Sequence, residues 1–289
     1  MTGVIHPLDW HLHLIWLLAF PALVAAYFWA TRREGTGATT RQSLLFLLGV
    51  VVLILAVTWP LGDLAAHWLL MALVVQRLLL MLAVPPLLVL GLPRPLIARL
   101  TRPAPVDAVL RVVVRPFPAV VIVTIVAVGT LTTGAVSLAA RSDVARVILE
   151  LAVLAAGFVL WAPVLTELPG ATRLSSLGRG GYLIVQSIVP SFLSIVWIFA
   201  RHSLYPSFTH GGKVAGMTPL LDQQLAGFLA KLSTIAVLWT VAFVIMTRAQ
   251  SEAGEEEADP LLWTDVEREL ERADRRQRRQ GWPGPPATR

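Results

Sequence analysis

The chain has 289 residues, of which 56% are hydrophobic and only 15% are charged, and its formal net charge is +6. Soluble domains carry about 25% charged residues, and here the apolar residues form long uninterrupted blocks, so an ordinary soluble protein is excluded. The chain contains no cysteine, which excludes disulfides, thiolate metal sites and cysteine nucleophiles. The excess of arginine fits the positive-inside rule for membrane proteins and does not indicate nucleic-acid binding.

The apolar blocks predict an all-α, polytopic integral membrane protein. A block of about 18 or more apolar residues can cross the hydrocarbon core as a helix. None of the blocks shows the alternation that barrel strands require. We expect seven spanning helices, at residues 13–30, 43–59, 67–91, 118–138, 144–165, 181–200 and 224–247.

Two segments between and after these spans differ in composition. Residues 92–117 are arginine- and proline-rich, and parts of them could form a helix on the membrane surface. Residues 251–289 are strongly charged and predict a cytoplasmic tail that is partly helical or disordered, beyond a transmembrane domain at 1–250. Lysine and arginine concentrate in alternate loops and in the tail, which predicts an outer N-terminus and a cytoplasmic C-terminus.

Several polar side chains fall at membrane depth, where they are costly and mark functional or structural sites. They form the expected intramembrane polar network: Gln76, Arg77, Arg146, Glu150, Asp222, Gln223, Gln224 and Lys231. Arg146 and Glu150 share a helix face, because they are four residues apart. We expect an ion pair of about 4 Å or less between Arg77 and Glu150. Either the network holds helices in register or it has a chemical role.

All six histidines fall on the predicted outer side of the membrane. Imidazole is a suitable copper ligand, and four of them are candidate ligands: His11, His13, His67 and His202. The alternative is that histidines are scattered at an interface that tolerates them. No nucleotide-binding loop, metalloprotease or nucleophile-elbow motif occurs, so the sequence does not predict an enzyme.

Three motifs occur in a fixed order along the chain. Residues 76–81 (Gln-Arg-Leu-Leu-Leu-Met) precede the pair Pro85–Pro86, residues 160–165 read Leu-Trp-Ala-Pro-Val-Leu, and a Leu-Tyr-Pro at 204–206 precedes Asp-Gln-Gln-Leu-Ala-Gly at 222–227. Together they resemble the CtaG-type cytochrome c oxidase assembly factors over roughly residues 10–250. The resemblance implies a seven-helix protein that helps to assemble a haem-copper terminal oxidase, with copper as the metal that it supplies or places.

The resemblance also implies two intramembrane histidine pairs, but the corresponding positions here hold Leu73, Arg77, Arg146 and Glu150. Arginine stays protonated and does not bind metal, so a copper role would have to use the outer histidines. The first alternative is a divergent member without metal, which acts as a membrane scaffold or partner protein. The second is a small-solute transporter, for which the Pro85–Pro86 break and the buried charges would be suitable.

The expected partners are the lipid bilayer and either a subunit of a terminal oxidase or another assembly factor. The expected location is a bacterial plasma membrane.

Overall fold

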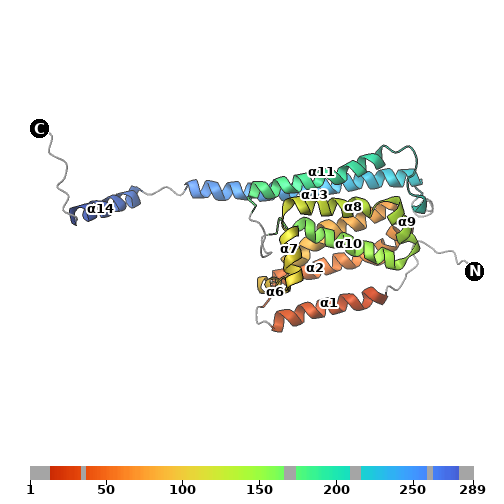
Figure 1. The fold of residues 1–289 in the computed structure, drawn as a ribbon, viewed down its shortest axis with the longest axis horizontal. Coiled ribbons are helices and arrows are strands. Elements are labelled where there is room, and N and C mark those ends of the chain that lie inside the picture. Colours follow the sequence, from red (N-terminus) through yellow and green to blue (C-terminus); the bar gives the residue numbers. More distant parts are fainter. Residues whose placement is uncertain (1–13, 34–36, 166–173, 209–215, 259–262, 280–289) are drawn as a thin grey trace, which may run out of the picture. The chain divides into compact units, whose positions relative to one another are not determined.

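The computed structural model describes residues 14–33, 37–165, 174–208, 216–258 and 263–279, and every element in that part of the chain is helical. The helices of the bundle pack side by side (Figure 1). Their bounds are α1 Leu14–Arg33, α2 Thr40–Val57, α3 Leu61–His67, α4 Leu70–Leu78, the π-helix η1 Leu79–Ala83, α5 Val84–Leu90, α6 Arg94–Leu100, α7 Ala104–Val113, α8 Pro116–Gly129, α9 Thr133–Arg141, α10 Asp143–Trp161, α11 Ser176–Ile198, the 3₁₀ turn η2 Pro206–Phe208, α13 Pro219–Ala258 and α14 Trp263–Arg279.

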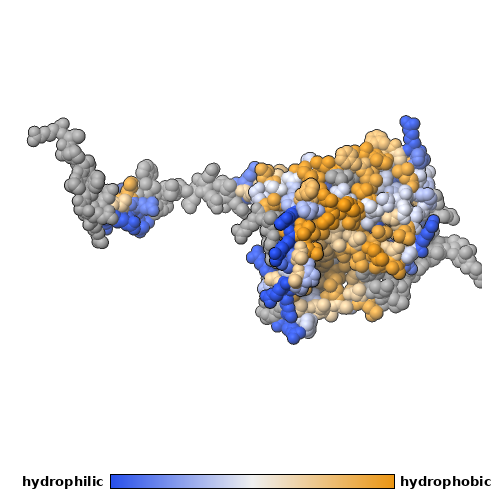
Figure 2. Space-filling view, viewed as in Figure 1, coloured by the Kyte–Doolittle hydropathy of each residue, from blue (hydrophilic) through white to orange (hydrophobic). Residues whose placement is uncertain are grey.

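The described helices include 5 segments that are long and apolar enough to cross a membrane. They are Thr40–His67, Leu70–Leu90, Asp143–Trp161, Ser176–Ile198 and Pro219–Ser251. The pair α7 and α8, bent by 94°, raises the number to 6 if it counts as one span. Apolar side chains cover the middle of the visible face of the bundle, and hydrophilic ones gather at its two ends (Figure 2). The chain is therefore an all-α protein with five or six candidate membrane spans.

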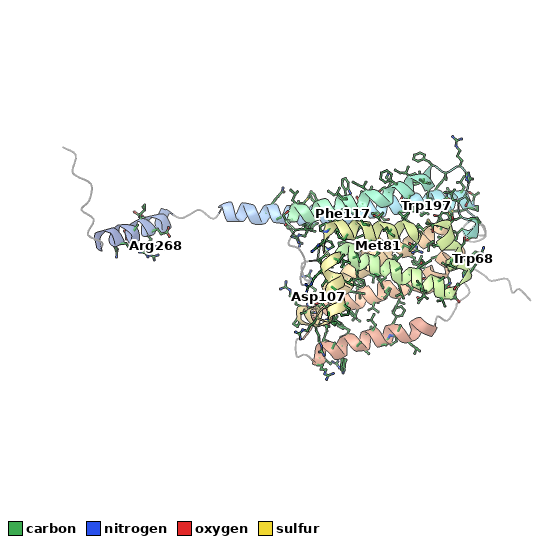
Figure 3. All side chains as sticks on the ribbon, in the orientation of Figure 1. Trp68, Met81, Asp107, Phe117, Trp197 and Arg268 are labelled. Atoms are coloured by element: carbon green, nitrogen blue, oxygen red, sulfur yellow. The ribbon has the colours of Figure 1, made fainter. Side chains whose placement is uncertain are left out.

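Labelled side chains mark the two ends of the bundle (Figure 3). Trp68, in the turn between α3 and α4, lies near one end, and Asp107 of α7 lies near the other. We call them the Trp68 end and the basic end, because the arginines at the end of α1, the start of α2 and in α6 and α7 gather near Asp107.

One predicted span is interrupted rather than continuous. The expected helix at 118–138 consists of α8 and α9, separated at Thr130–Thr132. A helix of 14 residues such as α8 is about 21 Å long, shorter than the ~30 Å hydrocarbon core. Thr132 ends the break by capping α9, because its hydroxyl accepts the N–H of Ala135. A threonine side chain favours the start of a helix. The length of an apolar block does not reveal such a start, so a single span was predicted.

The helix from Leu70 to Leu90 changes its winding in the middle of the bundle. Pro85 and Pro86 have no N–H, so the carbonyls of Met81 and Leu82 lose their usual helical donors. The five-residue π-helix η1 lies directly before them, and the Val84 N–H donates to the Leu79 carbonyl. The indole N–H of Trp161 donates to the freed Met81 carbonyl at 3.2 Å. A side chain from α10 thus supplies one of the hydrogen-bond donors that the prolines remove.

Close helix contacts at this point depend on one glycine. A Cβ at Gly157 would lie 2.7 Å from Pro85 Cγ and 2.8 Å from the Met81 carbonyl oxygen. Backbone approach of this kind is typical of membrane helix packing at small residues. α10 therefore packs directly against the widened segment of its neighbour.

The chain divides into two compact units, Met1–Phe243 and Val244–Arg289. The first contains the helix bundle and its cores. The second contains α14, whose sequence alternates acidic residues and arginines, and Arg275 pairs with Glu271 at 3.3 Å. The charged tail expected at 251–289 lies within this second unit.

Candidate functional site

Glu150 and Gln76 form a buried polar pair between α10 and α4. The Gln76 amide nitrogen donates to Glu150 Oε1 and to the Ala56 carbonyl, each at 3.0 Å. Both side chains are buried. A single amide therefore joins α2, α4 and α10, and the carboxylate is held by a neutral donor instead of the expected arginine.

The expected ion pair between Arg77 and Glu150 is wrong. Among the described side chains neither residue forms a direct salt bridge with the other, although their charges attract across a small cavity of ≈ 20 Å³ that both line. Arg146 also lines this cavity, and it pairs with Asp143 at 2.7 Å. Gln76, Arg77, Arg146 and Glu150 all line this cavity. The side chain that reaches Glu150 is Gln76 and not Arg77, because consecutive helix residues point in different directions.

The Asp222-Gln223-Gln224 segment at the start of α13 makes three separate connections. Asp222 accepts the N–H groups of Leu70 at 2.7 Å and Met71 at 3.1 Å, and so caps α4 from another helix. Gln223 Oε1 accepts the Leu204 N–H at 2.7 Å. The Gln224 amide donates to the Ala200 carbonyl at 3.3 Å. The motif therefore joins α13 to α4 and to the connection that follows α11.

Tyr205 fixes that connection at the Trp68 end. Its hydroxyl donates to the Leu131 carbonyl, in the break between α8 and α9. Its ring packs edge-on against Trp197, with centroids 5.8 Å apart. Burial raises the pKa of Tyr205 to about 12. The phenol therefore stays protonated at neutral pH and acts as a donor.

A second cavity, which we call the Arg77 cavity, lies inside the bundle. It measures ≈ 80 Å³ and is lined by residues of α4, η1, α8, α10, α11 and α13. Its polar lining residues include Arg77, Thr130, Gln186 and Trp197. Of these four residues, only Arg77 was expected from the sequence. Gln186 is a polar amide within an apolar span. It could have been expected by the same reasoning, because polar groups at membrane depth mark sites.

The candidate histidines are only partly described. His67, at the end of α3, and His202 are exposed, whereas His11 and His13 lie outside the described residues. Among the described residues there is no cluster of three or more histidine, cysteine or carboxylate side chains that could hold a metal ion. Lys231, also expected in the polar network, is half-buried on α13.

Copper does not fit the intramembrane positions at which the resemblance implies histidines. Leu73 offers no donor atom, and Arg77 and Arg146 stay cationic and repel a metal ion. Only Glu150 remains, and its carboxylate is bonded to Gln76. Copper in proteins is bound by imidazole, thiolate and thioether groups, so these four residues do not constitute a copper centre.

The fold and the site define a polytopic helical membrane protein with a few polar side chains buried inside an apolar bundle. Comparison with protein families is specific: residues 23–251 match the cytochrome c oxidase caa3 assembly factor family (Caa3_CtaG). The chain therefore belongs to the cytochrome c oxidase caa3 assembly factor family. No curated protein matches it, and no solved structure matches it.

Proposed function

We propose that this protein acts in the plasma membrane as a non-catalytic assembly factor for a haem-copper cytochrome c oxidase. Its family membership, which rests on a match from residue 23 within α1 to residue 251 within α13, carries the proposal. The three family-like motifs support it, because each makes a contact that holds the fold: Trp161 to Met81, Tyr205 to Leu131 and Asp222 to α4. The partner is an oxidase subunit or another assembly factor within the same membrane.

We further propose that the bundle contributes by binding its partner and not by holding copper at membrane depth. Leu73, Arg77, Arg146 and Glu150 support this, since they cannot form the histidine site implied by the resemblance. Large apolar side chains of α11 and α13 that face outward, such as Phe192, Phe228 and Phe243, are suited to contact lipid or a partner helix.

The assembly role is tested by deleting the gene in the native organism and restoring it from a plasmid. We expect the deletion to lower the amount of assembled cytochrome c oxidase, measured by the haem spectrum and oxygen consumption of isolated membranes, while oxidase subunit synthesis continues. A deletion strain with normal oxidase activity and normal oxidase copper content would contradict the proposal.

A copper role at the Trp68 end is the second candidate, and one observation favours it. His67 lines a surface cavity of ≈ 590 Å³ together with Trp68, Ser137 and Arg141. Copper bound there would use His67 with His11, His13 or His202. Replacing His11, His13 and His67 by alanine should then abolish stoichiometric copper in the purified protein, whereas His210→Ala, outside the proposed ligand set, should not. Equal copper content in all these variants would contradict this candidate.

The proposal includes seven spans with the N-terminus outside and the C-terminus in the cytoplasm. Two features support it. The 20-residue apolar helix α1 adds one crossing to the six that include the bent pair, and arginines gather at the basic end. Positive charge marks cytoplasmic loops.

A further inference from the structure

The Arg77 cavity has an apolar wall with a few polar groups set into it. Most lining residues are aliphatic, among them Val74, Leu78, Leu82 and Val123. A cavity needs about 10–15 Å³ to hold one water, so ≈ 80 Å³ admits several waters or one small organic molecule. Ligand sites are typically apolar with a small number of polar groups that orient the ligand.

Several polar atoms in this wall lack a well-formed hydrogen bond within the described part of the protein. They are Nε and Nη1 of Arg77, both amide atoms of Gln186, the hydroxyl of Thr130 and the indole nitrogen of Trp197, which lies near the Tyr205 hydroxyl. Arg77 is 8% exposed, and Gln186 and Trp197 are each 1% exposed. An unpartnered buried polar group costs about 1–3 kcal/mol, and more when it is charged. Four such side chains around one cavity indicate that a ligand supplies the missing partners.

The chemistry of these groups specifies what the ligand must offer. Guanidinium and indole nitrogens are donors only, while the hydroxyl and the amide can both donate and accept. The ligand must therefore present acceptors toward Arg77 and Trp197. Because Arg77 carries a full charge at membrane depth, a negative acceptor is favoured over a neutral one.

None of the charged and titratable groups described near Arg77 forms a direct bond to its guanidinium, so an anion can bind there. Glu150 on α10 attracts Arg77 without a direct bond, and its Oε1 is occupied by Gln76. The Tyr205 hydroxyl acts on Arg77 only at a distance and donates to Leu131. Arg146 adds a second positive charge on the α10 side.

The size and apolar wall distinguish among anions. A phosphate carries up to two charges and a large hydration shell. Stripping that shell when the ion enters an apolar cavity costs much free energy. A small monocarboxylate carries one charge, two acceptor oxygens that match the arginine fork, and a hydrocarbon part for the aliphatic wall.

We propose that the Arg77 cavity binds a small organic monocarboxylate, with its carboxylate on Arg77 and Trp197 and its hydrocarbon part against α8 and α13. Gln186 of α11 and Thr130, directly after α8, complete the hydrogen bonds. Neither His67 nor His202 lines this site, which does not depend on the assembly role.

The experiment titrates the purified full-length protein in nanodiscs with butyrate, by calorimetry and by thermal unfolding. The matched probes are butanol, which lacks the charge, butylamine, which has the opposite charge, and inorganic phosphate. We expect butyrate to bind and to raise the melting temperature, and at the same concentrations the other three probes should do neither.

Variants of the lining residues locate the binding. Arg77→Gln should weaken butyrate binding by at least about tenfold, and Trp197→Phe and Thr130→Val by several-fold each, since each removes one donor. Arg77→Lys keeps the charge but not the fork, so it should retain more affinity than Arg77→Gln. Thr124→Val is the matched control, because Thr124 also has an unpartnered hydroxyl on α8 but does not line the cavity.

Two results would overturn the proposal. One is butyrate binding no tighter than butanol or phosphate, which would show that the cavity does not select a carboxylate. The other is butyrate binding unchanged in Trp197→Phe and Thr130→Val, which remove the indole N–H and the hydroxyl and leave an apolar side chain at each position. These two variants keep the test decisive if Arg77→Gln fails to fold.

Discussion

Asp222 caps the start of α4, a role that usually belongs to the residue directly before the helix. The position before α4 is Leu69, which has an extended backbone and no capping side chain. The first N–H groups of any helix lack intrahelical partners, and in an apolar bundle water does not replace them. The Asp222 carboxylate accepts two of them from across the interface, so one residue both caps α4 and docks α13.

We therefore expect Asp222→Ala to lower the free energy of unfolding by about 1–3 kcal/mol, the range for a lost charge-assisted hydrogen bond or cap. Asp222→Asn keeps one acceptor oxygen and should recover part of that loss. Thermal or denaturant unfolding of the protein in detergent, followed by circular dichroism, measures both effects.

Gln224→Ala is the control for Asp222. The Gln224 side chain is half-buried and makes one hydrogen bond of 3.3 Å. Its loss should change stability by less than the loss of Asp222. If Asp222→Ala and Gln224→Ala destabilise equally, the capping role of Asp222 is wrong.

The segment from Leu70 to Leu90 shows what an element's sequence predicts. The pair Pro85–Pro86 predicted a break at that depth, but the helix runs on from Leu70 to Leu90 and only changes its winding there. The sequence could not predict the π-helix, or that Trp161 would satisfy Met81. Both depend on how closely α10 approaches, and Gly157, 76 residues after Met81 in the chain, sets that approach.

Gly157→Ala should disturb this contact. Its new Cβ would meet backbone atoms of Met81, which cannot move aside as a flexible side chain could. Overpacking of this kind costs about 1–3 kcal/mol, so the melting temperature should fall. Gly134→Ala in α9 is the matched control, since nothing lies within 4 Å of its new Cβ. Equal melting temperatures for the two variants would mean that α10 does not pack tightly on η1.

Trp161→Phe isolates the hydrogen bond within the same contact. Phenylalanine keeps most of the ring and removes the indole donor, so the Met81 carbonyl loses its partner. We expect a loss of about 1 kcal/mol, measured by the same unfolding experiment. A larger loss would show that the shape of the tryptophan matters more than its N–H.

At the scale of the whole molecule, composition and block length predicted the helical membrane class, and the order of three motifs predicted the family. The pairing of polar groups was less predictable. The spacing of Arg146 and Glu150 predicted that they share a helix face. Which residue of α4 contacts Glu150 depends on how α4 is rotated about its axis. The contact is made by Gln76 and not by the next residue, Arg77. The Arg77 cavity was not predicted, because it requires Trp197, Gln186 and Thr130 from elements far apart in sequence.

The absence of cysteine from the chain allows a direct test of the seven-span topology. Single cysteines can replace Arg141, which is exposed at the end of α9, and His202, which is exposed after α11. They can also replace Gly37 and Arg102, which are exposed near the basic end. A membrane-impermeant maleimide applied to intact spheroplasts should label the first pair. The second pair should react only after lysis, because lysine- and arginine-rich loops stay in the cytoplasm.

Thr2→Cys extends the test to α1. If α1 spans the membrane, a cysteine before it should react in intact spheroplasts, like the one at position 202, while the cysteine at Gly37 after it should not. Labelling of positions 2 and 37 from the same side would show that α1 does not cross and would reduce the count to six. The orientation would instead be reversed if positions 37 and 102 were labelled in intact spheroplasts while 141 and 202 were protected. The candidate histidines would then face the cytoplasm. A copper site on the outer surface would be contradicted.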